Sequence, residues 1–361
     1  MPTPQEILEE LKKVKYPGFS RDIVSFGLIR DIQVGYSGVT VYVRNPSSNE
    51  EVVATIAREI ERSVGAMAGV EQVRVEILGP DPNEQARRAI QSQRRKPENV
   101  RHVVAVASGK GGVGKSTVAV NLALAFAALG WRTGLMDADV YGPSLALMVG
   151  GKQPVTLTAQ KRIVPLERYG IRYVSMALFI DDERPVIWRG PMVAKLENEF
   201  LFNVEWGELD CLVLDLPPGT GDAQLTITQR VALDGGIIVT TPQELALLDV
   251  RRGVTMFKQV GVPVLGVVEN MSYYTCRNCG SRHQIFGQGG GARMAREMNL
   301  TLLGELPIVS ELREGADRAR PLVAVNPTHP ASIVFRQIAA KIRAQLDPTL
   351  FARVETGSSA D

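Results

Sequence analysis

A glycine-rich segment with two lysines is the part of the sequence best suited to chemistry. Residues 109–116 read GKGGVGKS, which fits the phosphate-binding pattern G-x-x-x-x-G-K-[ST]. Backbone N–H groups of such a loop point at phosphate oxygens, and the N-terminus of the following helix adds a positive end. The pattern predicts that Lys115 reaches the β- and γ-phosphates of a nucleotide and that the Ser116 hydroxyl binds Mg²⁺. The predicted nucleotide contacts are Gly109, Lys110, Gly111, Gly112, Val113, Gly114, Lys115, Ser116 and Thr117.

Aspartates follow two other apolar runs. Asp137 and Asp139 come after the run 132–136, and Asp215 ends an apolar run that begins at Cys211. Carboxylates at the C-terminal ends of parallel strands face the crevice where ligands bind, although an isolated aspartate there is also a common helix cap. An apolar run that ends in Asp is typical of a Walker B strand, so we expect Asp215 to hold Mg²⁺ through its water shell. Gly219, in the following segment LPPGTGD, could turn its amide toward the γ-phosphate.

Two cysteines at C-x-x-C spacing form a candidate metal site. Cys276 and Cys279 offer two thiolates, which do not close a tetrahedral site. His283 could be a third ligand, but a single histidine in such a segment is more often a solvated loop residue. A two-fold dimer would join two pairs into Cys₄, which fits either a [4Fe–4S] cluster or Zn²⁺. An inert exposed pair is the alternative, and Cys211, inside a predicted strand, is expected to pack in the core.

Composition limits the classes of function. The 361 residues suggest about two domains, and the 41 basic and 39 acidic residues leave a net charge of +2. This balance gives no electrostatic reason to expect nucleic-acid or membrane binding. Three cysteines exclude a disulfide framework, and the N-terminus has no apolar signal-peptide core. We therefore expect a cytoplasmic protein with reduced thiols.

The second part of the chain has the pattern of a parallel α/β sheet. Apolar runs alternate with helical segments, which is typical of βαβ units, and the runs are rich in Val, Ile and Leu. The pattern predicts a P-loop NTPase fold with a mostly parallel sheet of about seven strands sandwiched by helices. The predicted strands are 102–107, 132–136, 171–176, 211–216, 236–241, 264–269 and 302–306. A last helix at 331–346 is expected to pack on the sheet rather than to bind a membrane.

A small α+β domain is predicted before this sheet, over residues 1–79. Helical periodicity is found at 4–14 and 51–66, and strand patterns at 29–34, 39–43 and 70–78. Residues 80–100 contain several arginines and few large apolar residues, which indicates a solvated, partly helical linker. The predicted α/β domain then spans 101–347, and 348–361 is a polar tail.

The phosphate-binding loop resembles the deviant Walker A motif of the MinD/ParA-type ATPases, because it contains the additional lysine Lys110. In that group this lysine contacts the nucleotide of the partner subunit, so the resemblance implies a nucleotide-sandwich homodimer. It also implies that Asp139 orients the attacking water and that Asp137 supports the Mg²⁺ shell. Lys110, Lys115 and Asp139 are thus the implied catalytic residues, and Asn270 is implied to recognise adenine.

The order of the motifs is more specific than any one of them. The chain contains GKGGVGKS, DADVYGPS, WRGPM (188–192), DLPPGTGD, TTPQE and ENMSYYTCRNCG in succession. Together they resemble the Mrp/ApbC family of iron–sulfur cluster carrier ATPases, and the N-terminal domain resembles the assembly factor SufT. The resemblance implies slow ATP hydrolysis and a [4Fe–4S] cluster held by Cys276 and Cys279 at a homodimer interface. The implied partners are apo iron–sulfur proteins and cluster-assembly factors. The alternative is a MinD/ParA-like spatial-positioning switch whose cysteine pair binds zinc or is inert.

Overall fold

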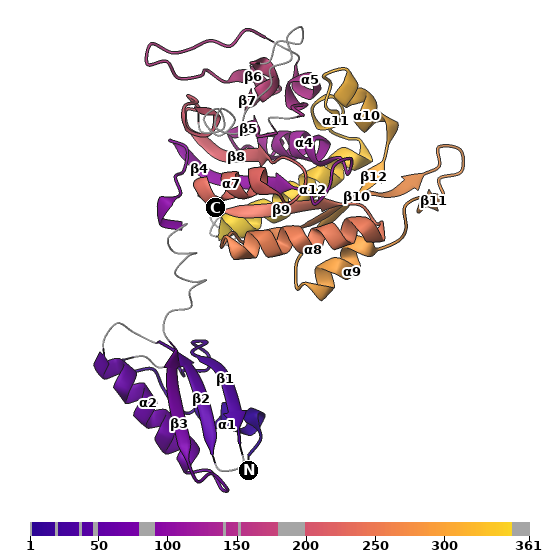
Figure 1. Cartoon of the computed structure of the whole chain (residues 1–361). Helices are drawn as coiled ribbons and strands as arrows, with labels where there is room; N and C mark the ends of the chain where they lie inside the picture. Colours follow the sequence, from indigo (N-terminus) through magenta and orange to yellow (C-terminus); the bar gives the residue numbers. More distant parts are fainter. Residues whose placement is uncertain are drawn as a thin grey trace, which may run out of the picture. The chain divides into compact units, whose positions relative to one another are not determined.

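The computed structural model describes residues 2–18, 21–35, 38–45, 50–78, 91–139, 142–150, 153–179 and 199–348. The chain divides into two compact units, Met1–Ala89 and Ile90–Asp361, and each is described by itself (Figure 1). Three predicted features lie outside the described residues: the first half of the linker, at 80–90, the WRGPM motif at 188–192, and the tail from 349 onward. Residues 140 and 141 of the DADVYGPS motif also lie outside them.

The first unit is the predicted α+β domain. Its elements are α1 (Pro4–Leu11), β1 (Ile29–Val34), β2 (Val39–Arg44), α2 (Glu50–Gly65) and β3 (Val73–Leu78). A capping box begins α1, since the side chain of Thr3 accepts from the amide of Glu6 and the carboxylate of Glu6 accepts from the amide of Thr3. The strands form one sheet in the order β1-β2-β3, with β1 antiparallel and β3 parallel to β2. Alternate residues of β2 pack with both helices in the core.

A nine-stranded sheet forms the centre of the described part of the second unit, in the order β11-β10-β9-β4-β8-β5-β7-β6, with β12 paired to β10. Seven of these strands are parallel, and all seven had been predicted: β4 (Val100–Ala107), β5 (Thr133–Asp137), β7 (Ile171–Val174), β8 (Leu209–Asp215), β9 (Gly235–Thr240), β10 (Val264–Thr275) and β12 (Leu302–Ile308). The two edge strands β6 (Leu166–Arg168) and β11 (Arg282–His283) are antiparallel and had not been predicted. The mostly parallel sheet is therefore confirmed.

Helices cover both faces of this sheet (Figure 1). Residues of β4 alternate between two cores: Val104 and Val106 pack on one face, and Val103 and Ala105 on the other. The first face carries α4 (Lys115–Ala128), α5 (Leu145–Val149), α11 (Leu322–Val325) and α12 (Pro330–Leu346), with α10 (Ser310–Asp317) against α5. The second face carries α7 (Asp222–Arg230), α8 (Glu244–Gln259) and α9 (Gly290–Glu297). The short 3₁₀ helix η1 (Met176–Leu178) follows β7.

The last helix packs on the sheet, as predicted. Phe335, Ile338, Ala339 and Ile342 of α12 are all fully buried, in the same core as α4. Among the described residues, none of the helices is long and apolar enough to cross a membrane.

The last residues of the predicted linker are attached to the second unit. The backbone of Arg95 bonds to Arg230 and Ala232, at 2.9 and 3.0 Å, and Lys96 forms an ion pair with Asp234 at 2.8 Å. The guanidinium of Arg95 also lies 4.8 Å from the centre of the Phe202 ring. This segment is therefore part of the surface that surrounds the sheet.

Candidate nucleotide and metal sites

The phosphate-binding loop joins the end of β4 to the start of α4. Gly112 and Gly114 both have φ near +81°, a conformation that favours glycine. Gly114 also has close neighbours, because a Cβ there would lie 2.3 Å from the amide nitrogen of Asn270. The loop encloses a cavity of about 230 Å³. The lining residues are Ser108, Lys110, Gly111, Gly112, Gly114, Lys115, Ser116, Thr117, Asp139, Ser144, Met148 and Pro218.

Lys115, which lines the cavity, belongs to a buried ion pair. The ammonium of Lys115 contacts Oδ1 of Asp215, and the two side chains are 7% and 0% exposed. The other oxygen, Oδ2, has no hydrogen-bond partner among the described residues. Burial raises the pKa of Asp215 despite the opposing effect of Lys115. The two residues predicted to serve the phosphates and Mg²⁺ are thus in contact.

A second buried carboxylate lies beside the first. Asp137 ends β5 in register with Asp215 on β8, and it accepts hydrogen bonds from the Ser175 hydroxyl at 2.9 Å and from the amide of Ser144 at 3.1 Å. Burial and the nearby charge of Asp215 raise the pKa of Asp137 to about 7. Two buried carboxylates at neighbouring strand ends are a donor set that suits a hard divalent cation. The oxygen atoms and the cavity therefore fit Mg²⁺ and nucleotide phosphates.

Asp139, Lys110, Gly219 and Asn270 are also part of this region. Asp139 and Lys110 line the cavity. The amide of Gly219 donates to the carbonyl of Ser108 at 3.0 Å, and the side-chain amide of Asn270 donates to the carbonyl of Val113 at 2.8 Å. The predicted contacts of Gly219 with the γ-phosphate and of Asn270 with adenine remain predictions. The first would require the present bond of Gly219 to change, whereas an asparagine side chain has a second N–H and an oxygen besides the N–H that bonds to Val113.

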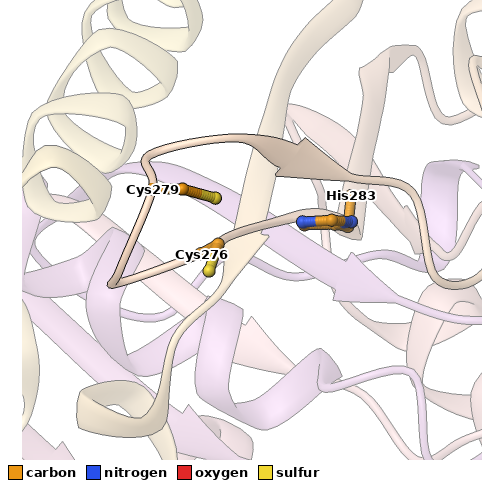
Figure 2. Close-up of side chains that lie close together, drawn as sticks. All are labelled: Cys276, Cys279 and His283. Atoms are coloured by element: carbon orange, nitrogen blue, oxygen red, sulfur yellow. The ribbon is translucent and has the colours of Figure 1, made fainter.

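The cysteine pair lies in a β-hairpin and has a third potential ligand. The Sγ atoms of Cys276 and Cys279 and a ring nitrogen of His283 all lie within 4.8 Å of one another (Figure 2). Cys276 is half-buried, whereas Cys279 and His283 are exposed. A hydrogen bond with Ser281 lowers the pKa of the Cys279 thiol. His283 is exposed, as expected for a solvated residue, but it lies in β11 rather than in a loop, and the pairing of this strand with β10 brings it to the cysteines. Cys211, in contrast, is fully buried in the core, as predicted.

Strand β10 connects the two sites. Asn270, which holds the carbonyl of Val113 in the phosphate-binding loop, precedes Cys276 by six residues on the same strand and its continuation. Met271 has φ +56° and interrupts the pairing of β10 with β12. The buried carboxylate of Glu269 contacts the Ser272 hydroxyl and the amide of Gly291 at the start of α9. Six residues of the chain thus separate the side chain that contacts the phosphate-binding loop from the first cysteine of the hairpin.

Two family profiles match the chain. A profile described as "NUBPL iron-transfer P-loop NTPase" matches residues 99–343, and a profile described as "Iron-sulfur cluster assembly protein" matches residues 4–77. An iron-sulfur cluster carrier protein of Helicobacter pylori is 38% identical over 349 residues, which cover 96% of this chain and 94% of the relative. An iron-sulfur cluster transfer protein NUBPL of Dictyostelium discoideum is 46% identical, over 69% of this chain and 78% of the relative.

Solved structures share the fold of the second unit. One of them is a nucleotide-binding protein of Archaeoglobus fulgidus, whose structure was solved in complex with ADP and in which cobalt was found. Its sequence is 37% identical to this chain, and the TM-score is 0.57. The similarity covers 68% of this chain and 95% of that one. The cell division ATPase MinD of Pyrococcus furiosus has a TM-score of 0.52 at 21% identity, over 68% of this chain and 99% of the other. At that identity the likeness concerns the fold alone.

Proposed function

The chain belongs to the family of iron–sulfur cluster carrier proteins built on a P-loop NTPase, and from this premise we propose that it is an ATP-dependent carrier of a [4Fe–4S] cluster. It binds and slowly hydrolyses ATP with Mg²⁺, holds the cluster as cargo at a homodimer interface and transfers it to apo-proteins. Cluster-assembly factors are the partners that would load it.

The nucleotide half of this proposal is supported by the cavity at the phosphate-binding loop. ATP phosphates would draw the Lys115 ammonium away from Asp215, and the carboxylate would then be available to the water shell of Mg²⁺. Mg²⁺ would supply charge neutralisation between the β- and γ-phosphates. The unpartnered Oδ2 of Asp215 and the in-register carboxylate of Asp137 would face that shell. Asp139, at the cavity wall, would orient the attacking water.

The metal half is supported by the exposure of the hairpin and by its ligand count. One chain offers only two thiolates, so a [4Fe–4S] cluster with four cysteine ligands requires two chains. A dimer that joins two hairpins would complete that set.

Exposed apolar residues that follow the hairpin and that begin α8 support such a dimer. Ile285 is 58% exposed, and Leu245 and Leu248 at the start of α8 are 72% and 54% exposed. The start of α9 lies close to Pro242, two residues before α8, because a Cβ on Gly290 would lie 2.6 Å from the carbonyl oxygen of Pro242. Burial of large apolar side chains of this kind in a dimer would be favourable.

The observation that carries the proposal is the shared strand. Asn270 bonds to the phosphate-binding loop, and Cys276 begins the metal hairpin six residues later. An ATP-driven change in the loop would therefore alter the exposure of the cargo. A MinD/ParA-like switch would use the same loop but has no need of cysteines at the end of β10.

The test is anaerobic reconstitution with iron and sulfide, followed by visible absorption and iron and sulfide analysis. Wild type is expected to develop a broad charge-transfer band at one cluster for two chains, and the double variant Cys276→Ala/Cys279→Ala is expected to remain colourless. Cys211→Ala is the matched control, because it also removes a cysteine but not from the hairpin. A colourless wild type, or stoichiometric zinc in its place, would refute the proposal and favour a P-loop switch with a zinc or idle pair.

A further inference from the structure

Two cysteines and one histidine, all residues that can bind a metal, lie close together at one end of the β10–β11 hairpin. Cys276 directly follows β10, Cys279 lies in the turn, and His283 is the last residue of β11 (Figure 2). Their ligand atoms all lie within 4.8 Å of one another. In the described part of the chain, this is the single group of three or more His, Cys, Asp or Glu residues that is close enough to hold a metal ion.

The backbone fixes where these three residues lie. Tyr274 pairs with His283 across the hairpin, and the amide of Cys276 donates to the carbonyl of Ser281 at 2.9 Å. The amide of Gly280 donates to the carbonyl of Cys276 at 2.9 Å, and Gly280 has φ +72°, which closes a tight turn between the cysteines and β11. The register therefore places His283 opposite Tyr274, and because alternate residues along a strand share a face, His283 is on the same face of the hairpin as Cys276.

Side-chain contacts hold the hairpin at both ends. Arg277, between the cysteines, forms an ion pair with Glu311 on α10 at 2.9 Å and donates to the Ser310 hydroxyl at 3.1 Å. The guanidinium of Arg282 lies 4.4 Å from the centre of the Tyr273 ring. The first two contacts connect the turn between the cysteines to α10, and the third joins β11 to β10.

The spacing is close to that of a tetrahedral site. With metal–sulfur and metal–nitrogen distances of about 2.3 and 2.0 Å, two sulfur ligands lie about 3.8 Å apart and a sulfur and a nitrogen about 3.6 Å apart. The ligand atoms of the three side chains are at most 4.8 Å apart, which is about 1 Å more than these separations. Side-chain rotations can bring the atoms closer by that amount. Two thiolates and an imidazole are the ligands that Zn²⁺ and similar borderline ions prefer.

We propose that His283 is a third protein ligand, so that a single chain holds one divalent ion of the zinc type in a Cys₂His site whose fourth position is open. This proposal rests on the assignment of Cys276 and Cys279 as metal ligands in the proposed function. Binding of the ion releases the two thiol protons to solvent, and the imidazole binds through a neutral ring nitrogen. The divalent ion needs one chain, whereas the [4Fe–4S] cargo needs two, so the two occupants compete for the same cysteines.

The test is an anaerobic titration of the reduced full chain with Co²⁺, which reports tetrahedral thiolate ligation through its visible and charge-transfer bands. His283→Ala is expected to weaken Co²⁺ binding about tenfold or more and to change the visible band. His283→Cys is expected to restore binding with a stronger charge-transfer band, since a third thiolate replaces the imidazole. Gln284→Ala, at the neighbouring exposed position, is the matched control and is expected to bind as wild type does.

The outcomes separate this proposal from the proposed function. Equal Co²⁺ affinity and an unchanged visible band in His283→Ala would overturn the role of His283, as would Co²⁺ binding that survives in Cys276→Ala/Cys279→Ala. Reconstitution with iron and sulfide is measured on the same proteins. His283→Ala is expected to assemble the cluster, because the four cysteines of a dimer remain. If wild type takes up no cluster but binds Co²⁺ in a His283-dependent way, the proposed function fails and the Cys₂His site stands.

Discussion

Replacing Lys115 with methionine should destabilise the second unit in the absence of nucleotide. The substitution keeps most of the side-chain length but removes the ammonium that contacts Asp215. Asp215 is then left fully buried, with neither oxygen paired to a cation and with Asp137 in register beside it. A buried charge without a partner is among the few changes that produce a large loss of stability.

The expected loss in free energy of unfolding at pH 8 is about 3–5 kcal/mol, which is typical when one partner of a buried ion pair is removed. The pH dependence follows from the carboxyl. Burial raises the pKa of Asp215 in the folded state above its unfolded value. The destabilisation of the folded state by the buried carboxylate charge is therefore absent below the unfolded pKa, and it grows as the pH rises toward the folded pKa. The loss should therefore be smaller at pH 5 than at pH 8. Adding Asp215→Asn to Lys115→Met removes the stranded charge and should recover most of the stability.

Guanidinium unfolding followed by tryptophan fluorescence measures this directly. All three tryptophans, Trp131, Trp188 and Trp206, belong to the second unit, so the signal does not include the N-terminal domain. Lys258→Met, at an exposed position on α8, is the control and should leave the midpoint close to that of wild type. If Lys115→Met unfolds at the wild-type midpoint at pH 8, or if the double variant is no more stable than the single one, the ion pair does not stabilise the second unit in this way.

Three further predictions concern the two sites. Lys110→Ala should keep ATP binding but weaken ATP-dependent dimerisation, measured by sedimentation velocity with and without ATP; an unchanged dimer would contradict the sandwich arrangement. Gly114→Ala should weaken ATP binding about tenfold, because φ near +81° costs an alanine about 1–2 kcal/mol and its Cβ would lie 2.3 Å from the amide of Asn270; wild-type affinity in calorimetry would argue against this. Iodoacetamide should label Cys279 at a lower pH than an ordinary thiol, since its pKa is lowered, and should spare Cys211 until unfolding; early labelling of Cys211 in mass spectra would contradict the burial.

Much of the nucleotide site could be predicted from the sequence because its signals are local. The loop 109–116 has a fixed spacing, and apolar runs such as those before Asp137 and Asp215 identify buried parallel strands. The carboxyl ends of such strands meet at one edge of a sheet, so the proximity of the predicted residues followed from the fold class. The contact of Lys115 with Asp215 agrees with that expectation.

The metal hairpin was harder to predict because its structure depends on pairing between short segments. Strand β11 has only two residues, so no alternation of polar and apolar side chains could identify it. The location of His283 depends on its register with Tyr274. The ion pair of Arg277 depends on Glu311, which is distant in sequence. The attachment of Arg95 to the second unit likewise depends on backbone bonds to residues 230 and 232, for which the sequence offers no signal.

Transfer of a cluster to an apo-protein is the activity that we propose, and it can be measured as the recovery of enzyme activity. Wild-type protein is loaded with iron and sulfide, freed of unbound iron with a chelator and mixed with an apo-enzyme that needs a [4Fe–4S] cluster for activity. We expect loaded wild type to restore the activity of that enzyme, and we expect no activity after Cys276→Ala/Cys279→Ala is taken through the same procedure. Equal activation by both proteins, or no activation by loaded wild type, would contradict the proposed transfer.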